Sequence, residues 1–317
     1  MEQRHLGRSG LLVSRLGLGT MTWGQDTAPD EAAAQLAAFV EAGGTFVDTA
    51  DVYSEGDSER ILGHLLRELV DRDEMVVGTK AAIRPNGRYD ASRRHLLGAL
   101  DASLDRLGLE YVDLWQLHVY DPATPIEETL SALDEAIVSG RARYVGVSNY
   151  TGWQLAKAAA WQKAWPGRTP IVSAQLEYSL LRRDIEREVV PAALDAGTGI
   201  LPWSPLGRGV LTGKYRTGIP ADSRAAAPHF TEFVQPYLDE ECGRIVESVV
   251  TAAEGLGVSP PSVALSWVRD RPGVVAPIVG ARTAAQLAVA LESEGLSLPH
   301  SIRSALDDVS DSAAGNP

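Results

Sequence analysis

The chain has 317 residues, of which 44% are hydrophobic and 22% are charged, and its formal net charge is −13. This length and composition suit a globular protein with a sizeable core, built either as two ordinary domains or as one large α/β barrel. The acidic balance argues against nucleic acid or an anionic membrane as a partner, because either would require a basic surface.

Cysteine usage and the first residues bear on the cellular compartment. Cys242 is the only cysteine, so neither an intrachain disulfide nor a cysteine-based metal cluster can form. A lone cysteine fits a reducing compartment. Residues 1–6 lack the apolar core of a signal peptide, and no apolar run approaches the length of a membrane helix. We therefore expect a cytoplasmic protein.

The first part of the chain predicts a hairpin, a strand and a helix. Residues 3–6 and 11–15 flank a glycine-bearing turn at 7–10, which is the pattern of a β-hairpin that could plug the floor of a barrel. Residues 16–20 indicate a first inner strand. Residues 30–43 carry alanines and leucines at helical spacing and end in glycine, which indicates a helix.

The same alternation of strand and helix continues along the chain. Further strand-like runs lie at residues 46–49, 75–79, 112–117, 144–147, 171–175, 200–203 and 274–279. Amphipathic stretches lie between them at residues 58–70, 92–107, 125–139, 152–165, 184–196 and 239–256. With the first strand included, this alternation predicts a single (β/α)8 barrel domain over residues 1–317, with a flexible tail at 310–317.

One long irregular segment, residues 207–236, is rich in glycine, proline, alanine and arginine. A loop of this length inside a compact domain is usually functional, and here it would close over the mouth of the barrel. The alternative is a surface insertion that the fold merely tolerates.

Polar side chains recur where the predicted strands end. Asp48 and Tyr53 follow the second barrel strand, and Lys80 ends the third. Later strands end in His118, in Ser148 and Asn149, in Gln175, and in Trp203 and Ser204. Each residue alone has an ordinary explanation, such as a turn cap, a solvated charge or a rim aromatic. Because catalytic residues of a barrel lie at the carboxyl ends of its strands, their recurrence indicates an active site.

Four of these residues suit the reduction of a carbonyl group by hydride transfer. A phenol has a pKa of about 10, too high for efficient proton donation at neutral pH, so Tyr53 needs a nearby cation. Lys80 can supply this cation, and Asp48 can keep a buried Lys80 charged. His118 can then orient the substrate oxygen. The chemistry requires no metal, and the chain has no cluster of ligands at metal-binding spacing.

Several longer motifs carry a family resemblance. They are VDTADVYSEGDSERILGHLL at residues 47–66, VGTK ending at Lys80, LWQLH ending at His118, YVGVSN ending at Asn149, SAQLEY around Gln175 and PWSPLGRGVLTGKY at residues 202–215. With these motifs the chain resembles the aldo-keto reductase family over nearly its whole length. The resemblance implies a (β/α)8 barrel, an NADPH/NADP+ cofactor bound without a Rossmann domain, and the catalytic tetrad Asp48, Tyr53, Lys80 and His118.

The resemblance also implies a set of cofactor contacts. The nicotinamide half would contact Gly19, Thr20, Met21, Asp48, Ser148, Asn149, Gln175 and Trp203. The pyrophosphate would lie against Ser204, Leu206, Gly207, Arg208, Lys214 and Arg224. The adenosine end would contact Gly280, Arg282 and Gln286, where Arg282 could pair with a 2′-phosphate and favour NADPH over NADH. Many relatives place an acid and an asparagine a turn later, where this chain has Val289 and Ala290.

The substrate is expected to be a small carbonyl compound. Its pocket would be walled by Trp23, Tyr53, Tyr89, His118, Val119 and Tyr120. Aromatic walls would suit aldehydes or flat ketones, although the same side chains are equally explained by ordinary rim packing. The fold alone cannot choose the substrate. The sequence also leaves open whether the chain forms a homo-oligomer.

Two other functions compete with a reductase. The chain is also similar to potassium-channel β-subunits, which keeps open a cofactor-binding sensor or partner protein with little turnover. In those subunits the histidine position is altered, whereas His118 is present here and favours an enzyme. A Schiff-base barrel enzyme with Lys80 as nucleophile is the second alternative, which the presence of Asp48 and Tyr53 at this spacing disfavours.

Overall fold

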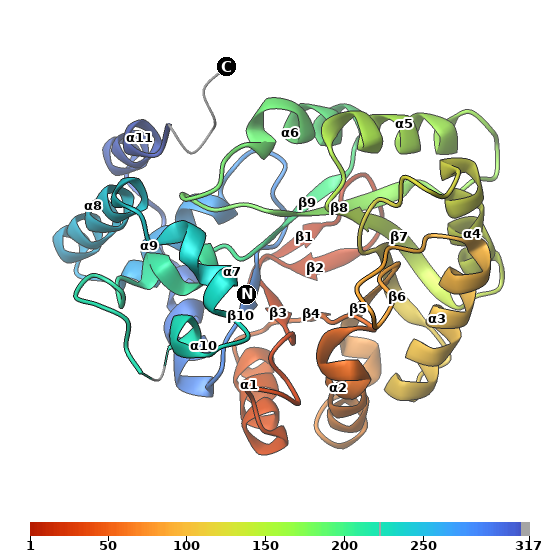
Figure 1. Cartoon of the computed structure of the whole chain (residues 1–317), viewed down its shortest axis with the longest axis horizontal. Helices are drawn as coiled ribbons and strands as arrows, with labels where there is room; N and C mark the ends of the chain where they lie inside the picture. The colour runs from red at the N-terminus through yellow and green to blue at the C-terminus, as the bar shows by residue number, and fades with distance from the viewer. Residues whose placement is uncertain (222, 312–317) are drawn as a thin grey trace.

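The computed structural model describes residues 1–221 and 223–311 and forms a (β/α)8 barrel (Figure 1). Its parallel strands lie in the order β10-β3-β4-β5-β6-β7-β8-β9. They are β3 (Gly17–Gly19), β4 (Phe46–Asp48), β5 (Val76–Ala81), β6 (Val112–Leu117), β7 (Ala142–Ser148), β8 (Ile171–Glu177), β9 (Gly199–Trp203) and β10 (Ile278–Gly280). Beside β10 the barrel closes through hydrogen bonds from Ile200 N to Gly273 O (2.8 Å) and from Val275 N to Ile200 O (2.9 Å).

Helices surround the strands on the outside of the barrel (Figure 1). They are α1 (Pro29–Glu41), α2 (Asp57–Glu68), α3 (Arg93–Leu107), α4 (Ile126–Val138), α5 (Gly152–Lys163), α6 (Ile185–Ala196), α8 (Glu240–Leu256), α9 (Pro260–Arg269), α10 (Ala284–Leu291) and α11 (His300–Val309). The alternation in the sequence predicts α1 to α6 and α8 but not α9, α10 and α11. The last strand is also shorter than the predicted 274–279, because residues 274 and 275 instead pair with β9.

Local sequence signals explain where these helices begin and end. The Ser92 side chain accepts a hydrogen bond from His95 N and caps α3, whose end is marked by Gly108 in the left-handed conformation. Thr151 and Gln154 form a capping box at the start of α5. Pro125 stands one position before the first turn of α4 as its N-cap rather than within that turn.

The N-terminal hairpin closes the floor of the barrel, as the sequence predicts. It consists of β1 (Gln3–His5) and β2 (Leu12–Ser14), paired antiparallel. Leu6 and Val13 are fully buried and belong to one apolar cluster with Phe46 and Leu114 from the barrel strands. The turn approaches so closely that a Cβ on Gly7, whose φ is +59°, would lie 2.6 Å from a backbone oxygen.

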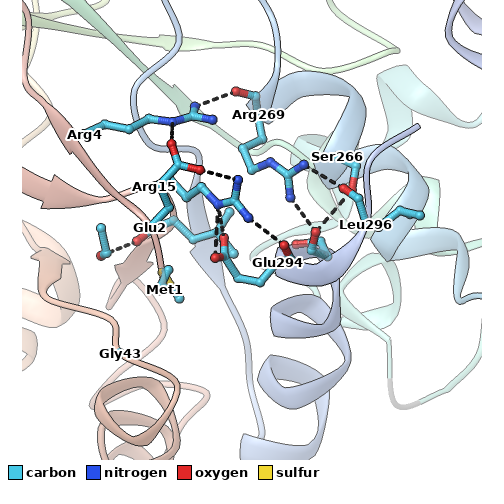
Figure 2. A network of polar contacts seen from close by, with 12 residues as sticks. Met1, Glu2, Arg4, Arg15, Gly43, Ser266, Arg269, Glu294 and Leu296 are labelled. Atoms are coloured by element: carbon cyan, nitrogen blue, oxygen red, sulfur yellow. Dashed lines mark hydrogen bonds and ion pairs between the residues drawn. The ribbon is translucent and has the colours of Figure 1, made fainter. Parts of the chain in front are cut away.

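A network of charges fastens this floor to the C-terminal helices (Figure 2). Arg15 Nη1 donates to Glu2 (2.7 Å), and Arg15 Nε donates to Glu294 (2.9 Å). Arg4 Nη1 donates to the carbonyl of Arg269 at 2.9 Å. Residues at the start of the chain are therefore held by segments that follow 265 to 279 positions later.

The segment 207–236, which we call the strap, covers the opposite end of the barrel. It is not irregular throughout, because it contains 3₁₀ turns at Gly207–Thr212 and Arg224–Ala226 and the short helix α7 (Thr231–Val234), and a further turn spans Gln235–Tyr237. Contacts of its described residues with the rest of the barrel include two near the mouth. Arg208 pairs with Glu177 (2.7 Å), and His229 Nε2 lies 3.2 Å from Asp26 Oδ2.

The C-terminal end differs in part from the predicted flexible tail. Ser310 is fully buried and accepts a hydrogen bond from Arg183 Nη1 at 2.8 Å. The rest of that prediction, residues 312–317, lies outside the described residues. Across the described ranges, no helix combines the length and hydrophobicity needed to cross a bilayer.

Candidate active site

A cavity of about 550 Å³ lies at the carboxyl ends of the barrel strands, beneath the strap. Its lining includes Asp48, which ends β4, and Tyr53, which follows the same strand. His118, which follows β6, and Trp203, which ends β9, line it too. The volume is in the usual range for a site that binds a small molecule or a cofactor. The strand-end residues predicted from the sequence therefore meet in one place.

Asp48, Lys80 and Tyr53 form a buried polar chain at the bottom of the cavity. Lys80 Nζ lies 2.6 Å from Asp48 Oδ2 and donates a second hydrogen bond to Thr49 O at 2.7 Å. The third contact runs from Lys80 Nζ to the Tyr53 hydroxyl oxygen at 3.4 Å. Lys80 is fully buried and Asp48 nearly so. Because a buried charge is stable only when it is paired, each of the two groups stabilises the charged form of the other.

The electrostatics of this chain set the protonation states. Burial alone lowers the pKa of Lys80, but Asp48 and the Tyr53 phenol more than offset it, so the pKa of Lys80 lies above its ordinary value. Burial raises the pKa of Tyr53, and the neighbouring Lys80 ammonium draws it part of the way back. The result is a protonated phenol held beside a fixed positive charge.

His118 stands on the other side of Tyr53. The loop that carries it is fixed by a hydrogen bond from His118 N to Ala81 O at 2.7 Å, and the two rings meet edge to face with centroids 5.9 Å apart. Burial and the nearby Lys80 lower the pKa of His118 to about 3, so the imidazole is neutral. Within residues 1–221 and 223–311, its buried Nδ1 has no hydrogen-bond partner.

Asn149 and its neighbours form one wall of the cavity. Asn149 adopts the left-handed conformation (φ +57°), which asparagine tolerates better than most residues. Its amide nitrogen donates to His118 O at 3.0 Å, and its amide oxygen accepts from Trp203 Nε1 at 3.0 Å. Ser148 Oγ donates to the carbonyl of Gln175 at 2.9 Å. These bonds fix the polar wall before any ligand binds.

Three cations gather at the other end of the cavity. Lys214, Arg224 and Arg282 all line it. Burial lowers the pKa of Lys214, and the charges of Arg282 and Arg224 lower it further. The pKa of Arg224 is also lowered, by burial and then by Arg282. In the described part of the chain, no carboxylate lies within 4.0 Å of the cationic nitrogens of Lys214 or Arg224. Such a cluster favours an anionic ligand.

Arg208 differs from these three cations although it also lines the cavity. Its guanidinium forms two hydrogen bonds with Glu177, at 2.8 and 2.7 Å, and a third with the carbonyl of Phe233. The guanidinium carbon lies 3.8 Å from the centre of the Phe233 ring. Arg208 therefore fastens the strap. Gly207, the residue before it, is buried but does not line the cavity.

The structure brings most of the remaining predicted cofactor residues to the cavity. Gly19, Thr20, Met21, Ser148, Asn149, Gln175, Ser204, Leu206, Gly280 and Gln286 line it. Further lining residues that the sequence did not single out include Thr22, Gly209, Thr212, Phe233 and Pro261. Val289 and Ala290, noted in the sequence as replacements for polar residues, also line it and make that part apolar.

The structure places four of the six residues predicted to wall the substrate pocket outside this cavity. Trp23 is fully buried and donates to Gln35 at 3.1 Å, so it is a core residue. Tyr89 is exposed, and Tyr120 packs edge to face against Tyr150. None of these, nor Val119, lines the cavity; of the predicted wall residues, only Tyr53 and His118 do.

The described residues contain no group of three or more His, Cys, Asp or Glu side chains that could hold a metal ion. The polar groups at the bottom of the cavity instead pair with one another or face open space. They are suited to donating protons and hydrogen bonds to an uncharged ligand.

Comparison with known proteins shows which proteins the chain is similar to. A probable voltage-gated potassium channel subunit beta from Oryza sativa subsp. japonica is 39% identical over 287 residues, 89% of this chain and 87% of that protein. An uncharacterized oxidoreductase from Bacillus subtilis (strain 168) is 34% identical over 327 residues, covering 98% and 96%. An L-glyceraldehyde 3-phosphate reductase from Escherichia coli (strain K12) is 36% identical over 298 residues, covering 90% and 86%.

The family assignment rests on a match to most of the chain. The sequence pattern of the aldo/keto reductase family matches residues 15–311, which include the whole barrel and the strap. The relatives named above match 89%, 98% and 90% of the chain and include one oxidoreductase and one reductase. The chain therefore belongs to the aldo/keto reductase family of oxidoreductases.

Proposed function

We propose that the protein reduces an aldehyde or ketone to an alcohol, with NADPH as the hydride donor and Tyr53 as the general acid. The observation that carries this proposal is the arrangement of Lys80 Nζ, 2.6 Å from Asp48 and 3.4 Å from the Tyr53 hydroxyl, at the bottom of the cavity. A phenol in contact with a buried ammonium group is the arrangement that proton donation to a carbonyl oxygen requires.

The cavity residues fit a nicotinamide dinucleotide. Lys214, Arg224 and Arg282 suit linked phosphates, because their mutual repulsion is relieved by an anion. At the other end, Asn149, Gln175 and the Trp203 ring suit the amide and the flat ring of nicotinamide. When bound there, the cofactor supplies the hydride that reduces the carbonyl carbon.

Residues of the chain then orient and protonate the substrate oxygen. The neutral His118 imidazole donates a hydrogen bond that orients it, and Tyr53 transfers the phenolic proton to it as negative charge develops. Lys80 stabilises the phenolate that remains. Asp48 keeps Lys80 charged and in place. The strap, fastened through Arg208 and Glu177, excludes water from this step.

The same cations support a preference for NADPH over NADH. Arg282 lines the cavity beside Lys214 and Arg224, and an additional phosphate would interact favourably with this positive cluster. We expect tighter binding of NADPH than of NADH. Equal affinities by fluorescence titration would remove this part of the proposal.

A second candidate function comes from relatives named as potassium channel beta subunits. Under that function the protein would bind the same cofactor and act chiefly as a sensor or partner with little turnover. His118 in contact with Tyr53 favours catalysis, because the neutral imidazole completes the set of groups that a carbonyl oxygen needs.

Turnover by the purified protein separates the two functions. NADPH oxidation is followed by absorbance against a panel of aldehydes, ketones, quinones and pyridoxal, and the best substrate is repeated with NADH. Saturable, substrate-dependent oxidation supports the reductase and narrows the substrate class. Tight NADPH binding without oxidation by any carbonyl supports the sensor or partner function.

A further inference from the structure

The Asp48 carboxylate has a second set of contacts on the side away from Lys80. Its Oδ2 pairs with Lys80, whereas its Oδ1 accepts hydrogen bonds from Gln175 Nε2 at 2.9 Å and from Gln116 Nε2 at 3.4 Å. Both amides are buried. Gln116 has no part in the proton transfer proposed above and does not line the cavity.

Gln116 is itself held by a third buried residue. Ser173 Oγ donates to Gln116 Oε1 at 3.1 Å. The opposite orientation of the amide would place its oxygen against the Asp48 carboxylate, where two acceptors repel each other. Ser173 and Asp48 therefore both favour the same orientation of the Gln116 amide, in which its nitrogen points at Asp48.

The barrel register brings these side chains together. Lys80 on β5 is paired with Gln116 on β6, Gln116 with Gly146 on β7, and Gly146 with Ser173 on β8. Gly146 keeps the row open. A Cβ at that position would lie 1.9 Å from Ser173 Oγ and 3.2 Å from Gln116 Cγ, so any larger residue would separate the pair.

We propose that Gln116, anchored by Ser173, is a positioning residue that aims the Asp48 carboxylate at Lys80. This inference rests on the proposed reductase function. Two donors on Oδ1 leave Oδ2 facing the ammonium group and favour the ion pair over a neutral carboxylic acid and amine. The fixed charge on Lys80 is what stabilises the Tyr53 phenolate, so the effect of Gln116 reaches Tyr53 through two intermediate groups.

The direction of the effect follows from this chain of contacts. Without the Gln116 donor, Asp48 is less well held, and the Lys80 charge is less firmly placed beside Tyr53. The phenol then ionises at a higher pH and becomes a poorer acid. The charged or titratable groups whose fields act on Tyr53 are Lys80, Asp48 and Asp51. The pKa of Asp51 is raised to about 7, first by burial and then by the charge of Glu59.

The test compares three variants. Gln116→Leu removes the donor and keeps a similar volume, and Ser173→Ala removes its anchor. Thr79→Val is the matched control, because the Thr79 hydroxyl is equally buried on β5 but donates to Glu59 at 2.6 Å rather than to Asp48. For each we would measure the melting temperature, NADPH affinity, kcat as a function of pH, and tyrosinate absorbance during alkaline titration.

Subtracting the titration of Tyr53→Phe isolates the Tyr53 signal from the other tyrosines. We expect Gln116→Leu to raise the pH at which Tyr53 ionises by about one unit and to lower kcat about tenfold, with NADPH affinity kept. Ser173→Ala should move both quantities in the same direction by less. The melting temperature of Thr79→Val should fall, but its kcat and its Tyr53 titration should equal those of the parent protein.

A folded Gln116→Leu with the parent kcat and the parent Tyr53 titration would overturn the inference. Should that variant fail to fold, an unchanged Tyr53 titration in Ser173→Ala would overturn it. Absence of turnover in the parent protein would instead contradict the proposed function, and the Tyr53 titration would still decide whether Gln116 acts on the catalytic chain.

Discussion

The floor and the mouth of the barrel both hold clustered cations, but the two regions differ in what faces those cations. At the floor, Arg15 contacts Glu2 and Glu294 (Figure 2). Arg269 contacts Asp270 there as well. At the mouth, Lys214 and Arg224 approach Arg282, and among the described residues no carboxylate lies within 4.0 Å of the cationic nitrogens of either of the first two. Oppositely charged pairs stabilise the fold, whereas a cluster of like positive charges creates a binding site for an anion.

The proposed catalytic chain of Asp48, Lys80 and Tyr53 combines both features in one site. Lys80 is fully paired with Asp48, as the floor arginines are with their acids, and this pairing keeps the charge in place. The groups that would meet a substrate, the Tyr53 hydroxyl and the His118 ring, are instead turned into the cavity. Preorganised catalysis needs supporting groups that are fixed by pairing, as Lys80 and Asp48 are, and reacting groups that stay accessible to the substrate, as Tyr53 and His118 are.

Replacement of Arg224 by Gln should have the largest effect on the mouth. It removes one of the clustered charges, so the Kd for NADPH should rise about 10–100-fold, the equivalent of about 1.5–3 kcal/mol for a charged hydrogen bond. The free energy of unfolding of the ligand-free protein should not fall, because like charges are separated. Fluorescence titration and urea unfolding measure the two quantities. An unchanged Kd would mean that this cluster does not hold the cofactor.

Replacement of Arg15 by Met should give the opposite pattern. It breaks the half-buried pair with Glu294 and the pair with the exposed Glu2, so the free energy of unfolding should fall by about 1–3 kcal/mol, mostly from the loss of the Glu294 contact. The Kd for NADPH should stay at the parent value, because the floor lies at the other end of the barrel. A loss of NADPH affinity in this variant would show that the two regions are not independent.

The smallest expected effect concerns acid stability and His118. The pKa of His118 is about 3 in the folded protein, below its ordinary value of 6.5, so the unfolded chain binds a proton that the folded chain does not. Stability should therefore decline as the pH falls from 6.5 towards 3. In His118→Asn this decline should be shallower, with little difference at neutral pH. Unfolding midpoints across this pH range measure it, and parallel curves would contradict the assignment.

The sequence predicts the barrel and the catalytic end of the site because both depend on local signals. Strand-end residues such as Asp48, Lys80 and His118 can be located from short apolar runs, and parallel strands must bring their carboxyl ends to one rim. The motif resemblance adds the cofactor end, where Lys214 and Arg224 do line the cavity. These parts need no knowledge of side-chain packing.

The parts that the sequence misses depend on contacts between distant segments. Trp23 resembles a rim aromatic until its bond to Gln35 places it in the core. Arg208 resembles a phosphate ligand and lines the cavity, but its pairing with Glu177, 31 positions away, which also fastens the strap, is not visible in the sequence. The contact between Gln116 and Asp48 follows from the register of the barrel strands, which hydrophobic patterning does not fix.

The measurement that tests the reductase function most directly is NADPH oxidation by the parent protein and by Tyr53→Phe with the same carbonyl substrate. This substitution removes the proton donor and keeps the ring against His118. We expect kcat to fall by a factor of about 10²–10⁴ or more while the Kd for NADPH is unchanged. Retained turnover in Tyr53→Phe would contradict the role of Tyr53 as the general acid.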